Sequence, residues 1–216
     1  NDKPNATEND LVFNNYAVER FRLNDEAIMY PSIDWRKYLL NKTSMQTQHN
    51  LNISGGTKDI RYFISLGFLY QNGLLKQFEG VGYDNNYKYK RYNYRANLDF
   101  NVTKTTTLKI GIGGIVGNRN EPMINDATNS IWTLINQTTP FSSPGVIDGQ
   151  LIVTPEERFD NKINLGNSAL PKCYGTGYST AINNTMNLDL LLNQKLDFIT
   201  KGLSAEIKGA YNTSYG

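Results

Sequence analysis

The side chains that most often perform catalysis are sparse in this chain. Its only histidine is His49 and its only cysteine is Cys173. A zinc site needs further histidine or cysteine ligands, which this chain lacks. The single cysteine also leaves no partner for a disulfide within the chain. We therefore predict no catalytic residue, no metal ligand and no cofactor site.

Carboxylates offer a second route to catalysis, because two of them can share the acid and base roles of a hydrolase. Asp99 and Glu206 are candidates. An isolated carboxylate on a strand is more often the partner of a cation, here Arg95 or Lys208. No motif brings a nucleophile and a base together. We expect the protein not to be an enzyme.

Glycines suggest a third possibility, a phosphate-binding loop in TLKIGIGGIVGNR at 107–119. The spacing matches neither G-x-x-x-x-G-K-[ST] nor G-x-G-x-x-G at the start of a helix. Glycines within a strand more often mark close approach, bending or space in a lumen. We interpret 107–119 as a strand.

Composition excludes further classes of function. The 216 residues carry 22 Lys and Arg against 20 Asp and Glu, a net charge of +2 without a basic run, so we expect no nucleic-acid partner. Hydrophobic residues make up 39% of the chain, below the roughly 45–50% of ordinary globular proteins, yet aromatic residues reach 12%.

No apolar run approaches the roughly 20 residues of a transmembrane helix. The opening NDKPNATEND is not a signal peptide, so any export signal is expected outside this chain.

Alternation of apolar and polar residues is the strongest pattern in the sequence. In RYNYRANLDFNVT at 91–103 every second residue is apolar, which predicts a strand with two unlike faces. The other predicted strands are 46–54, 60–71, 107–119, 183–196 and 203–214.

Two properties of these strands favour a membrane barrel over a soluble sheet. The strand at 91–103 is about 13 residues long, whereas soluble strands average about 5–6 residues and barrel spans need about 9–11. The connections also alternate between short and long, as they do in outer-membrane barrels. Short turns are predicted at 55–59, 104–107 and 197–202, and long connections at 72–90 and 120–180.

Aromatic residues gather at the strand ends if 60–71 pairs with 92–103. The end near the long connection holds Phe68, Tyr70, Tyr92 and Tyr94. The other end holds Tyr62 and Phe100. The band between them holds Ile64, Leu66, Ala96 and Leu98. An aliphatic band between two aromatic girdles is typical of a membrane barrel wall.

The predicted fold is all-β, a portion of an antiparallel up-and-down transmembrane barrel with long outer loops and short helices. Residues 1–45 form a loop and short-helix segment, and 46–119 form four strands. Residues 120–180 form a long extracellular loop with a short helix at 125–137, and 181–216 form two strands. About six strands are too few to close, so we expect the rest of the barrel outside this chain. The alternative is a soluble carbohydrate-binding β-sandwich.

Several stretches also resemble one family. These are YPSIDW at 30–35, QTQHNLNISGGTKDIRYFISLGFLYQNGLLK at 46–76 and YKRYNYRANLDFNVTKTTTLKIGI at 89–112. They resemble the SusC/RagA family of TonB-linked outer-membrane transporters, densely over about 30–115 and more loosely to 216.

The resemblance implies an early part of a 22-stranded barrel in the bacterial outer membrane. Such proteins import oligosaccharides or peptides with a SusD-like lipoprotein, and TonB drives them through a plug domain that is not recognisable here. The lipid bilayer is then a partner as well. We expect three aromatic residues of the long outer loop to stack on substrate: Trp132, Tyr174 and Tyr178.

Overall fold

A computed structural model describes residues 13–124, 130–154 and 168–216. The chain forms two compact units. The sheet unit contains Ser44–Gly73, Lys88–Asn120 and Thr180–Gly216, and the loop unit contains Asn1–Thr43, Leu74–Tyr87 and Glu121–Ser179.

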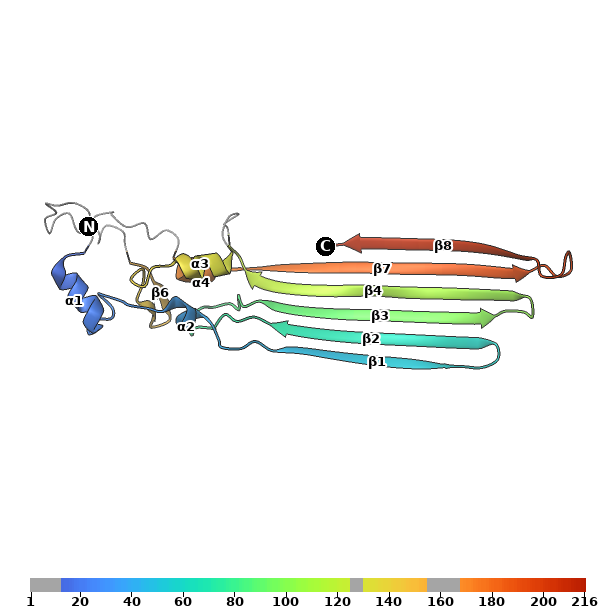
Figure 1. The fold of residues 1–216 in the computed structure, drawn as a ribbon, viewed down its shortest axis with the longest axis horizontal. Coiled ribbons are helices and arrows are strands. Elements are labelled where there is room, and N and C mark those ends of the chain that lie inside the picture. The colour runs from blue at the N-terminus through green and yellow to red at the C-terminus, as the bar shows by residue number, and fades with distance from the viewer. Residues whose placement is uncertain (1–12, 125–129, 155–167) are drawn as a thin grey trace. The chain divides into compact units, whose positions relative to one another are not determined.

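The sheet has six strands in the order β1-β2-β3-β4-β7-β8 (Figure 1). Pairing is antiparallel between β1 and β2, β2 and β3, β3 and β4, and β7 and β8. The strands are β1 (Gln46–Gly56), β2 (Ile60–Asn72), β3 (Lys88–Asn101), β4 (Thr106–Pro122), β7 (Tyr178–Lys195) and β8 (Ser204–Tyr215). The sheet is open, with β1 and β8 at its edges.

Strand lengths and connections agree with the prediction. The strands have 11 to 18 residues, which reaches or exceeds the roughly 9–11 residues of a barrel span. Short turns follow β1, β3 and β7, whereas the longer connections 73–87 and 123–177 follow β2 and β4. Among the described residues, no helix combines the length and apolar character needed to cross a bilayer.

The alternating pattern gives the sheet an apolar face and a polar face. Register places Ile53, Ile64, Ala96 and Ile112 side by side across four strands on the apolar face. Many of the large apolar side chains on this face are exposed within the sheet unit: Leu51, for example, is 56% exposed and Ile207 is 71% exposed.

The register pairs aromatic residues at the end near the long connection but not at the other end. Phe68 lies opposite Tyr92, with the ring centroids 5.1 Å apart. Tyr62, however, lies opposite Leu98, and Phe100 lies opposite Ile60. Tyr62 and Phe100 are therefore diagonal neighbours rather than a directly opposed pair. The other two aromatic residues face non-aromatic partners, since Tyr70 lies opposite Lys90 and Tyr94 lies opposite Leu66.

The loop unit joins segments that lie far apart in the sequence. Its helices are α1 (Asn15–Leu23), α2 (Trp35–Leu39), α3 (Ile131–Gln137) and α4 (Ala169–Tyr174), and its hairpin is β5 (Gly145–Ile147) with β6 (Gln150–Ile152). The core combines residues from α2, α3, α4 and the connection after β2: Trp35, Leu39, Leu75, Leu134, Ile135, Ala169, Leu170, Cys173 and Tyr174. The hairpin and α4 are additions to the predicted elements. The hairpin turns at Asp148 and Gly149, both with positive φ, as a tight two-residue turn requires.

Candidate functional site

The regular geometry of a β-strand, with side chains on alternate faces, also creates a polar hollow on the sheet unit. Its polar wall residues are Arg95 and Asn97 on β3 and Asn187 and Asp189 on β7. Between these strands runs β4, where Gly111 and Gly113 contribute no side chain. The missing side chains therefore leave a depression between two polar walls.

Two oxygen atoms converge over the glycine floor. A Cβ placed on Gly111 would lie 3.7 Å from Asn97 Oδ1 and 3.7 Å from Asp189 Oδ2. The Arg95 Nε donates a long hydrogen bond of 3.4 Å to Asn97 Oδ1. The hollow thus offers a guanidinium that donates hydrogen bonds, a carboxylate that accepts them and side-chain amides that can do either. These groups suit a polar ligand with hydroxyl or amide groups.

The carboxylates considered for catalysis lie elsewhere and apart. Asp99 lies opposite Lys109, and its Oδ2 is 3.8 Å from Nη2 of Arg61. Its nearest recorded cation is therefore Arg61 and not the expected Arg95. Glu206 lies on the edge strand β8, opposite Asn193. Within the part of the chain that the structure describes, no group of three or more His, Cys, Asp and Glu side chains could hold a metal ion.

The aromatic residues predicted to stack on substrate have different environments in the loop unit. Trp132 on α3 is 52% exposed, and Tyr178 at the start of β7 is 51% exposed. Both rings are open to a ligand, so their predicted role stays a prediction. Tyr178 also lies 6.0 Å from Tyr83, measured between ring centroids.

Tyr174 is instead part of the core, with only 2% of its surface exposed. Its hydroxyl donates a hydrogen bond of 2.7 Å to the carbonyl of Lys76, and burial raises its pKa. The ring also packs edge-on against Phe78, with 5.1 Å between centroids. This placement corrects the expectation that Tyr174 is displayed on the loop surface. The reason is that short α4 buries most of its residues, which loop composition does not reveal.

A small polar network fixes α4 to the connection after β2. The Tyr83 hydroxyl donates to the carbonyl of Tyr174 and accepts from the Gly177 amide at 3.0 Å. The side-chain amide of Asn85, itself fully buried, donates to the carbonyl of Cys173. These bonds satisfy carbonyl groups at the end of the helix, where no further helical turn supplies donors.

Cys173 is fully buried within this core. Desolvation raises the pKa of its thiol to about 12. Since the thiolate is the reactive form, the residue has the character of an inert structural cysteine.

The YPSIDW stretch forms a packed anchor in the loop unit. Asp34 caps α2 and accepts a hydrogen bond of 3.2 Å from the Lys37 amide. Hydrogen bonds from Lys37 and the charge of its ammonium hold the pKa of the Asp34 carboxyl below its usual value. Trp35 is buried, and its Nε1 donates a hydrogen bond of 2.8 Å to the carbonyl of Thr139.

Comparisons with known proteins agree with this architecture. No family model matches the chain. An alignment 125 residues long is 26% identical to the TonB-dependent receptor SusC of Bacteroides thetaiotaomicron, and it covers 51% of this chain and 12% of that protein.

Solved structures show the same fold over most of the chain. A chain of the RagAB peptide importer in its closed-closed state matches with a TM-score of 0.59 and 15% identity, covering 98% of this chain and 23% of that chain. The open-open state matches with a TM-score of 0.53 and 16% identity, covering 84% of this chain and 18% of that chain. The chain thus spans less than a quarter of the proteins it resembles, and it has the barrel-type antiparallel fold of RagA and SusC.

Proposed function

We propose that this SusC/RagA-like chain forms part of the barrel wall of a TonB-dependent nutrient importer in the bacterial outer membrane. The observation that carries the proposal is the two-faced sheet of long strands, apolar on one side and polar on the other. In a barrel of this kind the apolar side faces lipid and the polar side faces the lumen. The alternation of short turns and long connections also supports a barrel of this kind.

Exposure of the apolar face favours lipid over a soluble core. Leu66 is 48% exposed and Leu190 is 43% exposed, although both belong to regular strands. A β-sandwich would cover such residues with a second sheet. The second sheet among the described residues has two strands of three residues each, and it belongs to the loop unit. This observation weakens the alternative of a soluble carbohydrate-binding module.

The proposed substrate is an oligosaccharide or a peptide, because SusC and the RagAB peptide importer are the proteins that this chain resembles. We further propose that a SusD-like lipoprotein is the partner and that TonB acts through a plug domain. The polar hollow and the exposed rings of Trp132 and Tyr178 would contact substrate as it passes. Transport requires no bond-making chemistry, and we assign no catalytic residue.

Spin labels test the orientation of the wall. Labels replace Ile64 and Leu98 on the apolar face, and a matched label replaces Asn97 on the polar face. In bilayers we expect oxygen to relax the labels at Ile64 and Leu98 more strongly than a water-soluble nickel complex does. For the label at Asn97 we expect the nickel complex to have the stronger effect. Labels at Ile64 and Leu98 that sit in water or in a tight protein core would refute the barrel proposal.

Uptake by cells tests the transport role. Deleting the gene should abolish growth on, and uptake of, one labelled oligosaccharide or peptide, and restoring the gene should recover both. Deleting the gene of the proposed SusD-like lipoprotein should reduce uptake of the same compound. Normal uptake of every oligosaccharide and peptide without the gene would contradict the proposed function.

A further inference from the structure

We propose that the apolar face of the sheet binds one anionic, phosphate-bearing membrane lipid between β1, β2 and β3. One acyl chain lies in a groove between two rows of side chains, and the phosphate lies beside Lys90. The inference rests on the proposed placement of this face in a membrane, and it adds a specific lipid site to that placement.

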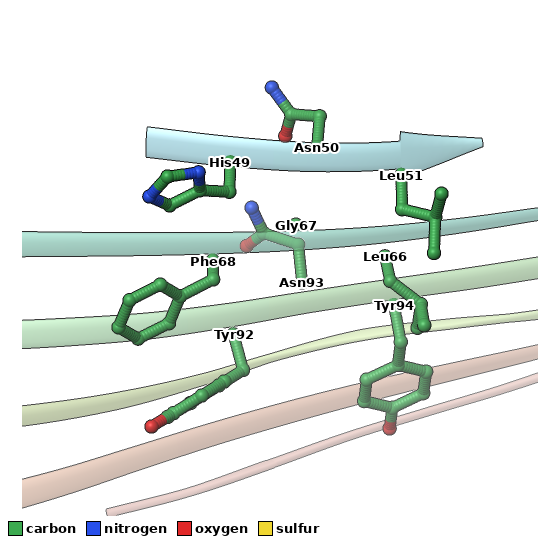
Figure 2. Close-up of a pocket in the computed structure, with 9 residues that line it drawn as sticks. All are labelled: His49, Asn50, Leu51, Leu66, Gly67, Phe68, Tyr92, Asn93 and Tyr94. Carbon is green, nitrogen blue, oxygen red and sulfur yellow. The ribbon is translucent and has the colours of Figure 1, made fainter. Parts of the chain in front are cut away.

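The first wall of the groove is a row of three rings. His49, Phe68 and Tyr92 lie opposite one another on β1, β2 and β3. The His49 and Phe68 ring centroids are 6.4 Å apart with nearly parallel planes at 14°, and those of Phe68 and Tyr92 are 5.1 Å apart. Figure 2 shows the three rings on the same side of the sheet.

The second wall is the next row on the same face. This row contains Leu51, Leu66 and Tyr94. Each lies two residues along its strand from a member of the ring row, so the two rows are about 6.8 Å apart along the strands. Asn50 and Asn93, between the rows in sequence, point to the other side of the sheet in Figure 2. A continuous apolar groove therefore separates the two rows, and it is lined by both.

The groove has room for a narrow chain because Tyr94 leans away from β2. Its ring lies over Gly114, the residue directly opposite on β4, where a side chain would occupy the same space. The gap is therefore a consequence of a glycine in the neighbouring strand. A hydrocarbon chain is narrow and flexible enough to fill such a gap, where it gains dispersion contacts with both walls.

Charge identifies the kind of headgroup. One row beyond the rings, toward the long connection, Tyr70 lies opposite Lys90, and Thr47 lies on the other side of Tyr70. Lys90 is exposed, and this row contains no carboxylate to compete for its ammonium. An ammonium and a neighbouring phenolic hydroxyl are donors from which a phosphate accepts hydrogen bonds.

The opposite end of the same face lacks this combination. Its terminal row contains Ile60, Phe100 and Leu108, without a cation. If lipid bound only through a general affinity for apolar strands, both ends of this face would bind it equally. The rings, the groove and the lysine occur together only at the end nearer the long connections, among the described residues of β1 to β4.

The experiment uses the whole protein reconstituted in phosphatidylcholine bilayers that contain a minor fraction of spin-labelled phosphatidylglycerol. The wild-type protein should immobilise the labelled lipid with higher affinity than spin-labelled phosphatidylcholine. Lys90→Gln should lower the affinity for phosphatidylglycerol about fivefold, the usual effect of one basic residue near a membrane surface. Phe68→Ala should weaken binding of both lipids by removing the middle of the groove wall.

Lys109→Gln is the matched control, because Lys109 lies on the polar face opposite Asp99. It should leave phosphatidylglycerol binding unchanged. Equal loss in Lys90→Gln and Lys109→Gln, or equal affinity of the wild-type protein for both lipids, would overturn the lipid site. In either case a protein that inserts and transports leaves the proposed function standing, whereas a wild-type protein that does not insert refutes both.

Discussion

Tyr94 lies directly opposite Gly114 across β3 and β4, and its ring occupies the space that a side chain at residue 114 would need. Tyr62 and Gly55 repeat the relationship across β1 and β2, where a Cβ on the glycine would lie 2.6 Å from the tyrosine hydroxyl oxygen. In both pairs a ring covers a glycine that has no side chain of its own to pack. Such pairs fix strand register on an apolar face.

Gly114→Ala should destabilise the folded protein by about 1–3 kcal/mol, because the added methyl group overpacks the site. The new Cβ would clash with the ring of Tyr94 and with the backbone carbonyl of Thr185, which cannot turn aside. Unfolding by urea in lipid bilayers measures the change. Gly209→Ala on β8 is the control, since no heavy atom beyond its two chain neighbours lies within 4 Å of the position that its new Cβ would take. Equal effects of the two changes would show that the tyrosine contact is unimportant.

Leu51→Arg should destabilise membrane insertion by about 2–4 kcal/mol if Leu51 faces the middle of the bilayer, whereas Asn52→Arg should have a much smaller effect. The two residues are neighbours on β1 and point to opposite faces. Folding into vesicles at increasing urea concentration gives both values. A larger cost for Asn52→Arg would reverse the assignment of the two faces.

Replacing Arg95 with Gln or Asp189 with Asn should lower substrate affinity about tenfold, the usual effect of losing a charge-assisted hydrogen bond. Initial uptake rates over a range of substrate concentrations separate lower affinity from lower abundance. Glu206→Gln is the control, since Glu206 lies on the polar face outside the hollow. If the control and the hollow variants lose uptake equally, the hollow has no specific role.

Trp132→Ala and Tyr178→Ala should each weaken substrate binding about three- to tenfold, since each removes an exposed ring that can stack. Phe198→Ala is the control, because Phe198 is 79% exposed in the short turn after β7. Binding is measured on purified transporter with the compound that the uptake assay identifies. Unchanged affinity in both loop variants would remove these residues from the substrate path.

Cys173 should resist alkylation at neutral pH until the loop unit unfolds, because it is buried and its thiol has a pKa of about 12. A Lys201→Cys variant on a Cys173→Ser background places a thiol in an exposed turn and should react rapidly. Mass spectrometry after iodoacetamide treatment gives both rates. Comparable rates would show that the core around α4 is open.

Alkaline pH should lower the stability of the same unit. The folded state keeps the Cys173 proton to about pH 12, while the unfolded thiol releases it near its ordinary pKa of 9.0. The unfolded state therefore binds fewer protons between these values, so the free energy of unfolding falls as pH rises through that range. Cys173→Ala should show a smaller fall in thermal denaturation. An equal fall would assign the effect to other groups.

The sequence by itself determined the strands and their two faces. The predicted strand at 60–71 appears as Ile60–Asn72, and the one at 46–54 appears as Gln46–Gly56. This was possible because alternation is a local property: the pleat of a single strand sends successive side chains to opposite faces. The order of short and long connections was readable for the same reason, since it follows from where the alternation stops.

Only the tertiary structure decided which residues meet. The register that places Tyr94 over Gly114 depends on pairing between separate strands, and an offset of two residues leaves the alternating pattern unchanged. Burial of Tyr174 and the bond from Trp35 to Thr139 join segments about a hundred residues apart in the chain. The polar hollow likewise needs β3, β4 and β7 side by side. Contacts of this kind arise from packing between distant segments, which no local pattern encodes.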